Sequence, residues 1–351
     1  MNSKRVVYEV FERGEGAWIP MHVESDSKDE EYFLGDVVGI GAKIREWRRY
    51  NSIGGPFRRF ENESLTDWCS RVYCDSYPWP STDDVVNEAV TTFLAEARRY
   101  SSEKFIICKI LGPTETAEAF FAPPQSSRAR ELGQIYHRFD FALYLKLRYS
   151  EATKIYDRIA SYILELVKAC AELDIVDAVR IADDVCWYGG TLYNWDFVRD
   201  KYLYWHRLFA NAIKRRGKYA ILHTDGDITR NNLVRELASI YDALHPLDLC
   251  PKSTVDAAYR WVGRIIEVRK LLSDLSKRTV FFTGLPIDLI FNDSIVVSEL
   301  TKLVEYFLKM HGKRDLVIAT THRPYPGRSY SEDLPRKKVQ AVRELLRAYS
   351  L

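Results

Sequence analysis

The feature that most constrains the fold of this chain is a repeated alternation of short apolar strands with long amphipathic helices. Each predicted strand is a run of apolar residues that ends in polar or small residues. The helices between them carry apolar residues at helical spacing. The predicted strands are 105–111, 178–182, 221–222, 243–244, 281–282 and 317–319, and the predicted helices are 151–173, 195–216, 253–277, 294–311 and 335–349.

Strands and helices that alternate in this way predict a parallel sheet, either in a doubly wound fold or in a barrel. No glycine-rich phosphate loop follows an early strand, which excludes the simplest dinucleotide-binding form of the doubly wound fold. The number of strands, with a first strand at 17–23, favours an α/β fold of the (β/α)8 TIM barrel type. We expect one barrel domain over residues 1–351.

The N-terminal part, residues 1–104, diverges most from the barrel pattern and predicts an N-terminal excursion. Residues 34–50 are helix-like, and residues 57–79 indicate a hairpin or an irregular segment, so that 50–80 is the least regular stretch. A helix is expected to follow, from a cap at Ser81 to about residue 100. Residues 123–137 are rich in Pro, Ser and Arg and indicate a surface loop or a lid.

Charge and composition exclude several classes of function. The 51 basic and 49 acidic residues give a net charge of +2, which provides no overall basis for binding nucleic acid or an anionic membrane. We recognise no signal peptide and no long apolar run, and the 6 cysteines lack CxxC spacing. We therefore expect a protein of the reducing cytoplasm.

The polar ends of the strands are the expected site, because the active site of an α/β barrel is built from the C-terminal ends of its strands. The strongest candidate is the stretch KYAILHTDGD, residues 218–227. Alternation along its strand places His223 and Asp225 on one side, which suits a metal ion or a proton-transfer pair. The polar strand ends are His22, Asp183, Asp184, His223, Asp225, His245, Asp288 and His322.

A metal role is expected for three of these residues. His223, Asp225 and His322 supply ligands that suit zinc or another divalent ion, with a position left open for substrate. The structural alternative is that Asp225 and Gly226 simply form a turn.

Catalytic roles are expected for Asp183, Asp184, His245 and Asp288, and His22 is expected to contact the substrate. Of the adjacent aspartates Asp183 and Asp184, one should face the pocket and the other should face away. The structural alternative for His245 is a hydrogen-bonded histidine of the core.

Basic residues bracket a loop that contains Gly54, Gly55 and Pro56. A loop rich in arginine beside an active site can hold carboxylates, and Arg58 and Arg59 are therefore candidate substrate-binding residues. The alternative is a solvated, charged face. The basic residues are Lys43, Arg45, Arg48, Arg49, Arg58 and Arg59.

The strand ends also carry a family resemblance. From Phe105 onward, the order and spacing of short motifs resemble the uroporphyrinogen decarboxylase superfamily, which includes cobalamin-dependent methyltransferases. The fold of that family is an α/β barrel, so the resemblance implies the fold that the residue pattern predicts. The motifs are Gly112-Pro113, Ala182-Asp183-Asp184, His223-Thr224-Asp225-Gly226, Leu244-His245-Pro246, Gly284 with Asp288, and His322 to Pro326.

The resemblance implies one of two activities, of which decarboxylation in porphyrin biosynthesis is our second hypothesis. Uroporphyrinogen decarboxylases carry an arginine-rich segment after the first strand, which binds the propionate groups of their substrate. This chain has Glu24 and Asp26 there instead. Acidic side chains repel a substrate with many carboxylates unless relocated arginines such as Arg58 and Arg59 compensate.

The leading hypothesis is a metal-assisted methyltransferase for a small molecule. The related methyltransferases bind zinc through a His-x-Cys pair and a later Cys; here His223 fits the histidine, Asp225 replaces the first cysteine, and His322 stands near the second. The resemblance further implies a corrinoid carried by a partner protein, and it allows for a homodimer. A non-catalytic barrel retained for binding is the third hypothesis.

Overall fold

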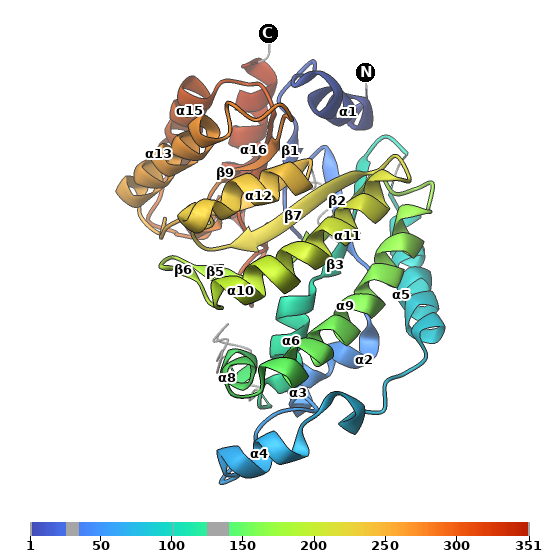
Figure 1. Cartoon of the computed structure of the whole chain (residues 1–351). Helices are drawn as coiled ribbons and strands as arrows, with labels where there is room; N and C mark the ends of the chain where they lie inside the picture. The colour runs from blue at the N-terminus through green and yellow to red at the C-terminus, as the bar shows by residue number, and fades with distance from the viewer. Residues whose placement is uncertain (1, 26–34, 101, 125–139, 350–351) are drawn as a thin grey trace.

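The computed structural model describes residues 2–25, 35–100, 102–124 and 140–349. Over these residues, eight parallel strands close into a barrel (Figure 1), and the last strand pairs with the first. This is the predicted (β/α)8 TIM barrel. Its strands are β1 (Met21–His22), β2 (Val37–Gly41), β3 (Phe105–Leu111), β4 (Ala178–Ala182), β7 (Tyr219–Asp225), β8 (Ala243–Asp248), β9 (Val280–Leu285) and β10 (Leu316–Thr320).

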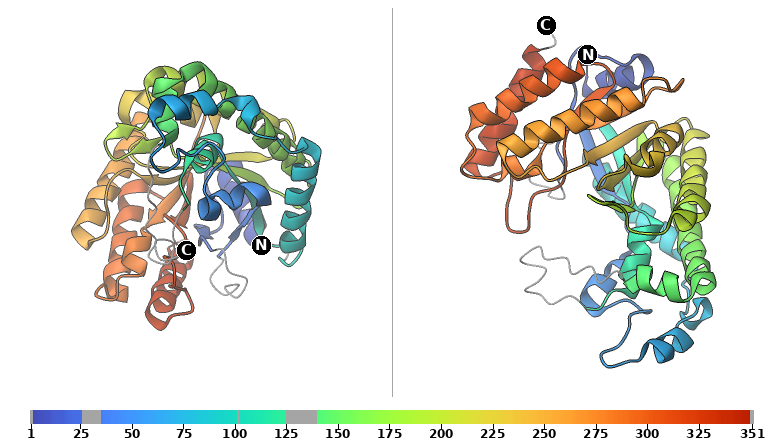
Figure 2. Two further views of the ribbon diagram at one scale, coloured as in Figure 1. Left: turned by 90° about the horizontal axis from the view of Figure 1, so that it is seen from below. Right: turned by 60° about the vertical axis from the view of Figure 1, so that its left-hand side comes forward.

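Helices surround the strands (Figure 2), and their limits follow local signals in the sequence. Gly312, for example, has a φ of 79° where the helix 297–311 ends, a conformation that glycine adopts readily. The main helices are α1 (Ser3–Arg13), α5 (Thr82–Ala97), α6 (Pro113–Phe121), α8 (Asp140–Leu147), α9 (Tyr149–Ala171), α11 (Leu203–Lys214), α12 (Leu233–Ile240), α13 (Val255–Leu271), α15 (Val297–His311) and α16 (Asp333–Ala348).

Shorter elements occupy the connections between them. A small antiparallel hairpin of β5 (Cys186–Trp187) and β6 (Gly190–Thr191) follows β4. None of the helices in the described ranges is long and apolar enough to cross a membrane. The short helical segments are α2 (Arg45–Arg48), α3 (Tyr50–Ile53), α4 (Leu65–Arg71), η2 (Cys74–Ser76), α10 (Trp195–Phe197), η3 (Val198–Tyr202), η4 (Arg230–Asn232) and α14 (Ile287–Ile290).

The second barrel strand corrects one prediction. The expected helix over 34–50 is wrong, because β2 lies there and the chain turns helical only at α2. The sequence of β2, VVGIG, combines β-branched residues with glycines, both of which disfavour a helix. Gly39 also leaves room inside the barrel, since a Cβ there would lie 3.0 Å from Cδ of Lys109 and 3.4 Å from Cε1 of His22.

The stretch 50–80 is irregular, as predicted, but it contains α3, α4 and η2 rather than a hairpin. Trp68 of α4 is fully buried and donates from its indole nitrogen to the carbonyl of Phe57 at 2.8 Å. Its ring packs against Tyr144 of α8 with 5.2 Å between centroids, so aromatic packing holds the excursion in place. The loop or lid predicted at 123–137 lies outside the described residues from 125 onward.

An element that the sequence analysis did not predict, α1, closes the N-terminal end of the barrel. Its Val7 and Val10 are buried among the first residues of the strands, and Phe11 stacks on Tyr219 with 4.0 Å between ring centroids. Burial of each valine contributes roughly 1.5–3 kcal/mol. α1 therefore covers the N-terminal end of the barrel.

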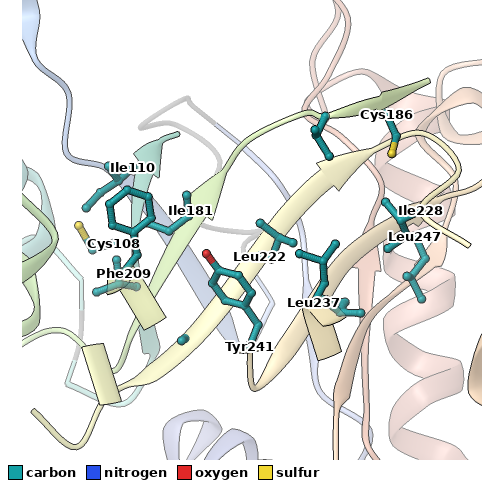
Figure 3. Close-up of a cluster of buried hydrophobic side chains, with 14 of the residues drawn as sticks. Cys108, Ile110, Ile181, Cys186, Phe209, Leu222, Ile228, Leu237, Tyr241 and Leu247 are labelled. Carbon is teal, nitrogen blue, oxygen red and sulfur yellow. The ribbon is translucent and has the colours of Figure 1, made fainter. Parts of the chain in front are cut away.

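A larger core lies between the strands and the outer helices. Figure 3 shows Ile181 of β4 and Leu222 of β7 beside Phe209 of α11 and Tyr241. These side chains leave the barrel outward, while their neighbours along each strand point inward. Packing on the outer face thus determines which residues of each strand are directed into the barrel interior.

Candidate functional site

Three possible metal ligands meet at the C-terminal ends of the neighbouring strands β4 and β7. Ala182 is opposite His223 in the register, so the residues that follow emerge side by side. The backbone N–H of Asp225 donates to Asp184 Oδ1 at 2.7 Å. One ligand atom each from Asp184, His223 and Asp225 lies within 4.8 Å of the others. The structure brings two predicted metal ligands together and adds Asp184, for which a catalytic role is predicted.

His223 is held in the tautomer that a metal ligand needs. His245 Nε2 lies 3.0 Å from the carbonyl oxygen of Thr320, which can only accept, so His245 donates from Nε2. Burial lowers the pKa of both histidines well below the usual value, so both rings are neutral. His245 Nδ1 must then accept the 2.6 Å hydrogen bond from His223 Nδ1. An unprotonated Nε2 remains on His223, 4.0 Å from Asp225 Oδ1.

Carboxylates crowd this position. Burial, followed by the charges of Asp183 and Asp248, raises the pKa of Asp184 to about 6. Burial and the charge of Asp184 likewise raise the pKa of Asp225 and that of Glu115 well above the usual values. A bound cation would relieve this repulsion, because it neutralises charges that water no longer screens.

The donor set fits a divalent metal ion. Among the described residues, Asp225 Oδ1 is a buried atom without a hydrogen-bond partner. Carboxylate and imidazole donors suit zinc and similar ions, and a set of three leaves a position for substrate. His322, the third ligand in the prediction, is exposed, and its ring centroid lies 6.3 Å from that of His223. The group of three possible ligands within 4.8 Å of one another contains Asp184 in place of His322.

Asp183 faces away from this set, as predicted for one of the two aspartates. It is fully buried, and its Oδ1 accepts from the backbone N–H of Thr114 at 2.8 Å and of Glu115 at 3.0 Å. Its Oδ2 accepts from Thr114 Oγ1 at 3.0 Å and lies 3.0 Å from His206 Nε2. The carboxylate accepts from the first backbone N–H groups of α6 and so holds the start of that helix.

Glu115 is a site residue that the sequence analysis missed. It lies in the first turn of α6, directly after β3, and the charges of Asp184, Asp183 and Asp225 act on its carboxyl group. The signal is present in the sequence, because the run 112–115, GPTE, follows an apolar strand. That run predicts a turn into a helix, and polar side chains at such a turn face the mouth of a barrel.

An ion cluster lies deeper in the barrel. Arg180 Nη2 is 2.6 Å from Glu24 Oε1, and Lys109 Nζ is 3.4 Å from Glu24 Oε2. Burial would raise the pKa of Glu24, but the charges of Arg180 and Lys109 hold it well below the usual value. His22, predicted to contact substrate, joins the cluster with Nε2 at 3.4 Å from Glu24 Oε1. The sequence analysis missed Arg180. An arginine inside an apolar strand indicates a buried ion pair, because arginine is rarely buried without a partner.

A separate cluster of polar side chains lies at the rim, where β8 ends and α14 begins, and it includes Tyr188 of the hairpin β5–β6. Lys252 Nζ is 2.5 Å from Asp248 Oδ1 and 3.8 Å from Asp288 Oδ2. The hydroxyl of Tyr325 donates to Asp288, and that of Tyr188 lies 3.4 Å from Asp248 Oδ1. Asp288, for which a catalytic role is predicted, therefore belongs to the rim and shares one lysine with Asp248.

The basic loop belongs to the excursion. Arg58 Nη1 donates to the carbonyl of Gly55 at 3.0 Å, and its guanidinium carbon lies 5.1 Å from the ring centroid of Phe60. Arg59 is partly exposed in the same segment. These contacts tie the predicted substrate-binding arginine Arg58 to its own loop.

Comparisons with known proteins support the barrel fold but identify no family for the chain. No protein family model and no curated protein matches the chain. A solved structure of a methyltransferase from Methanosarcina mazei is similar over 99% of both chains, with 14% identity and a TM-score of 0.61. An endo-β-1,4-mannanase double mutant from Cellulomonas fimi matches 97% of this chain and 74% of its own, with 12% identity and a TM-score of 0.50. These likenesses show a shared barrel fold, and both similar proteins are enzymes.

Proposed function

We propose that this protein is a metal-dependent methyltransferase that acts on a small molecule at the mouth of the barrel. The observation that carries the proposal is the convergence of Asp184, His223 and Asp225 within 4.8 Å. The resemblance to the uroporphyrinogen decarboxylase superfamily supports it, and so does the shared fold with a methyltransferase. Fold alone does not define an activity, so the donor set is the main support.

Each residue of the site has a distinct part in this proposal. Asp184, His223 and Asp225 would hold zinc or another divalent ion, and His245 would keep His223 oriented and deprotonated at Nε2. Such an ion, when bound, lowers the pKa of a substrate oxygen or nitrogen and makes a methyl group a better electrophile. Two carboxylates in place of thiolates favour a strong Lewis acid, which suits an oxygen or nitrogen substrate better than a thiol.

A corrinoid on a partner protein is proposed as the carrier of the methyl group, on the basis of the superfamily resemblance. Methylcobalamin is the probe for this step, because loss of its methyl group changes its visible absorbance. Transfer to an added oxygen or nitrogen acceptor that depends on this protein and on zinc would support the proposal. Transfer that proceeds equally without the protein would contradict it.

Electrostatics disfavour the decarboxylase alternative. The mouth carries the carboxylates of Asp184, Asp225 and Glu115, whose raised pKa values reflect burial and mutual repulsion. A porphyrinogen with many carboxylates would add negative charge to this position. Arg58, which would have to compensate, donates within its own loop.

Metal content is the measurement that tests the proposal. Purified protein should hold about one equivalent of zinc or a similar ion by elemental analysis, and His223→Ala and Asp225→Asn should lose it while circular dichroism stays unchanged. Glu305→Gln, at an exposed position of α15, is the matched control and should keep the metal. A folded His223→Ala variant with full metal content would contradict the proposed metal site. Metal binding without any methyl transfer would favour a binding barrel.

A further inference from the structure

We propose that His206 and Tyr241 are positioning residues of the proposed metal site and that they act through Asp183. His206 lies on α11 and Tyr241 follows directly after α12, and both side chains are fully buried. Asp183 is the neighbour of the proposed ligand Asp184 in the chain. The inference rests on the proposed function in that it assigns these two residues a part in metal binding.

A chain of buried hydrogen bonds connects Tyr241 to Asp183. The hydroxyl of Tyr241 lies 2.5 Å from His206 Nδ1, and His206 Nε2 lies 3.0 Å from Asp183 Oδ2. The carboxylate of Asp183 can only accept, so Nε2 of the neutral imidazole carries the hydrogen and Nδ1 accepts from Tyr241. The hydroxyl of Tyr241 therefore fixes the ring of His206 in the orientation that donates to Asp183.

The backbone of Asp183 is joined to two of the proposed ligands. Its N–H donates to the carbonyl of His223 at 2.9 Å, and Asp184 is the next residue in the chain. The backbone N–H of Asp225 donates in turn to Asp184 Oδ1 at 2.7 Å. Ligands have to be held within about 0.5 Å of the geometry that a metal requires. A shift of Asp183 would move two of them directly and would disturb the third.

The segment that carries His206 holds the backbone of Asp183 as well as its side chain. The hydroxyl of Tyr202, the residue before α11, donates to the carbonyl oxygen of Asp183 at 3.1 Å. The ring of Tyr202 packs on that of His206 with 4.0 Å between centroids. Asp183 is thus held by α11 on one side, and by the backbone N–H groups of Thr114 and Glu115 in α6 on the other.

Packing alone does not require polar residues in this layer. Ile181 and Leu222 on the strands and Phe209 of α11 fill it with apolar side chains beside Tyr241 (Figure 3). Buried polar groups are unfavourable unless each one is hydrogen-bonded, whereas a fully bonded network makes the arrangement rigid and unique. The hydrogen bonds of His206 therefore add a defined position for Asp183, which apolar contacts would leave free to vary.

The zinc affinity of folded variants tests the inference. His206→Leu removes both hydrogen bonds of the ring, and zinc affinity should fall about 10-fold in a calorimetric titration, at the lower end of the loss for a partner that touches a ligand directly. His206→Gln keeps a donor for Asp183 and an acceptor for Tyr241, so it should restore most of the affinity. Circular dichroism shows that each variant is folded in the titration buffer.

A matched pair of tyrosine substitutions separates positioning from stability. Tyr241→Phe removes only the hydroxyl that orients His206, and zinc affinity should fall about 3-fold to 10-fold, the effect of one neutral hydrogen bond. Tyr8→Phe is the control, because the Tyr8 hydroxyl donates to Asp177 at 2.9 Å just before β4, at the opposite end of that strand. Its loss should leave zinc affinity unchanged. An equal fall in both variants would mean that zinc binding follows overall stability, and it would overturn the inference.

Amide hydrogen exchange separates this inference from the proposed function, because it requires no metal. In metal-free His206→Leu, the N–H of Asp225, which is bonded to Asp184, should lose part of its protection, while the amides of β9 keep theirs. Such a local loss supports the positioning role even if the protein never binds zinc. Unchanged protection at Asp225 overturns the inference. Unchanged zinc affinity in His206→Leu also overturns it, although the metal site would then stand.

Discussion

At the scale of single residues, the site depends on hydrogen bonds that lie behind the proposed metal ligands. The carbonyl of Thr320 determines which nitrogen of His245 carries the proton, and His245 determines the same for His223. Two successive hydrogen bonds, from His245 to Thr320 and from His223 to His245, thus leave the lone pair of His223 on Nε2. Loss of a partner of this kind typically lowers metal affinity about 10-fold to 100-fold.

Substitution of His245 tests this relay. His245→Ala removes the acceptor for His223 Nδ1, so zinc affinity should fall about 10-fold to 100-fold in a calorimetric titration, with the fold retained. His245→Gln can still accept from His223 and donate to Thr320, and it should restore much of the affinity. Equal affinity in His245→Ala and the unaltered protein would mean that the relay does not control the ligand.

At the scale of elements, the corner between β3 and α6 is the tightest part of the site. Asp183, at the end of β4, accepts from the first backbone N–H groups of α6, where the partial positive charge of the helix favours a carboxylate. Gly112 forms the corner, and a Cβ there would lie 2.2 Å from Cβ of Asp183. The corner brings Glu115 to the metal ligands, so its packing and the site are coupled.

A pair of glycine substitutions separates this packing from helix propensity. Gly112→Ala should lower the free energy of unfolding by about 1–3 kcal/mol, because the added methyl overlaps Asp183. Gly263→Ala, in the middle of α13 with nothing within 4 Å of its added Cβ, should raise it by about 0.5–1 kcal/mol. Urea unfolding measures both. A Gly112→Ala variant as stable as the unaltered protein would show that the corner can relax.

At the scale of the whole molecule, stability should depend on pH through Glu118. Burial raises its pKa to about 7, although a hydrogen bond from Tyr193 partly opposes the shift. Between pH 4.5, its ordinary pKa, and about 7, the folded protein keeps a proton that the unfolded chain releases. Folding is therefore favoured at the acidic side of this window, and the stability is lost as pH rises.

Glu118→Gln should remove this dependence. The free energy of unfolding of the unaltered protein, relative to that of the variant, should fall by up to about 3 kcal/mol between pH 4.5 and 7.5. Urea unfolding of both proteins across this range provides the comparison. Parallel profiles would show that Glu118 ionises in the folded protein as it does in water.

Much of the architecture could be predicted, because periodicity is a local property. Six of the barrel strands, and the helices predicted at 151–173, 195–216, 253–277, 294–311 and 335–349, follow apolar patterns in the sequence. β2 was not predicted, because its short glycine-containing run is stabilised by pairing with β3 and not by its own propensity. α1 was not predicted either, because its apolar residues are buried only by contact with the end of the barrel that the helix covers.

The sequence by itself determined the barrel, the polar strand ends, and the pairing of His223 with Asp225, since each follows from spacing along one strand or helix. Only the tertiary structure placed Asp184 together with His223 and Asp225 in one group of possible ligands. It also decided that Asp183 serves α6 and that Arg180 meets Glu24 across the interior. These contacts join strands far apart in the chain, and their geometry depends on how the barrel closes.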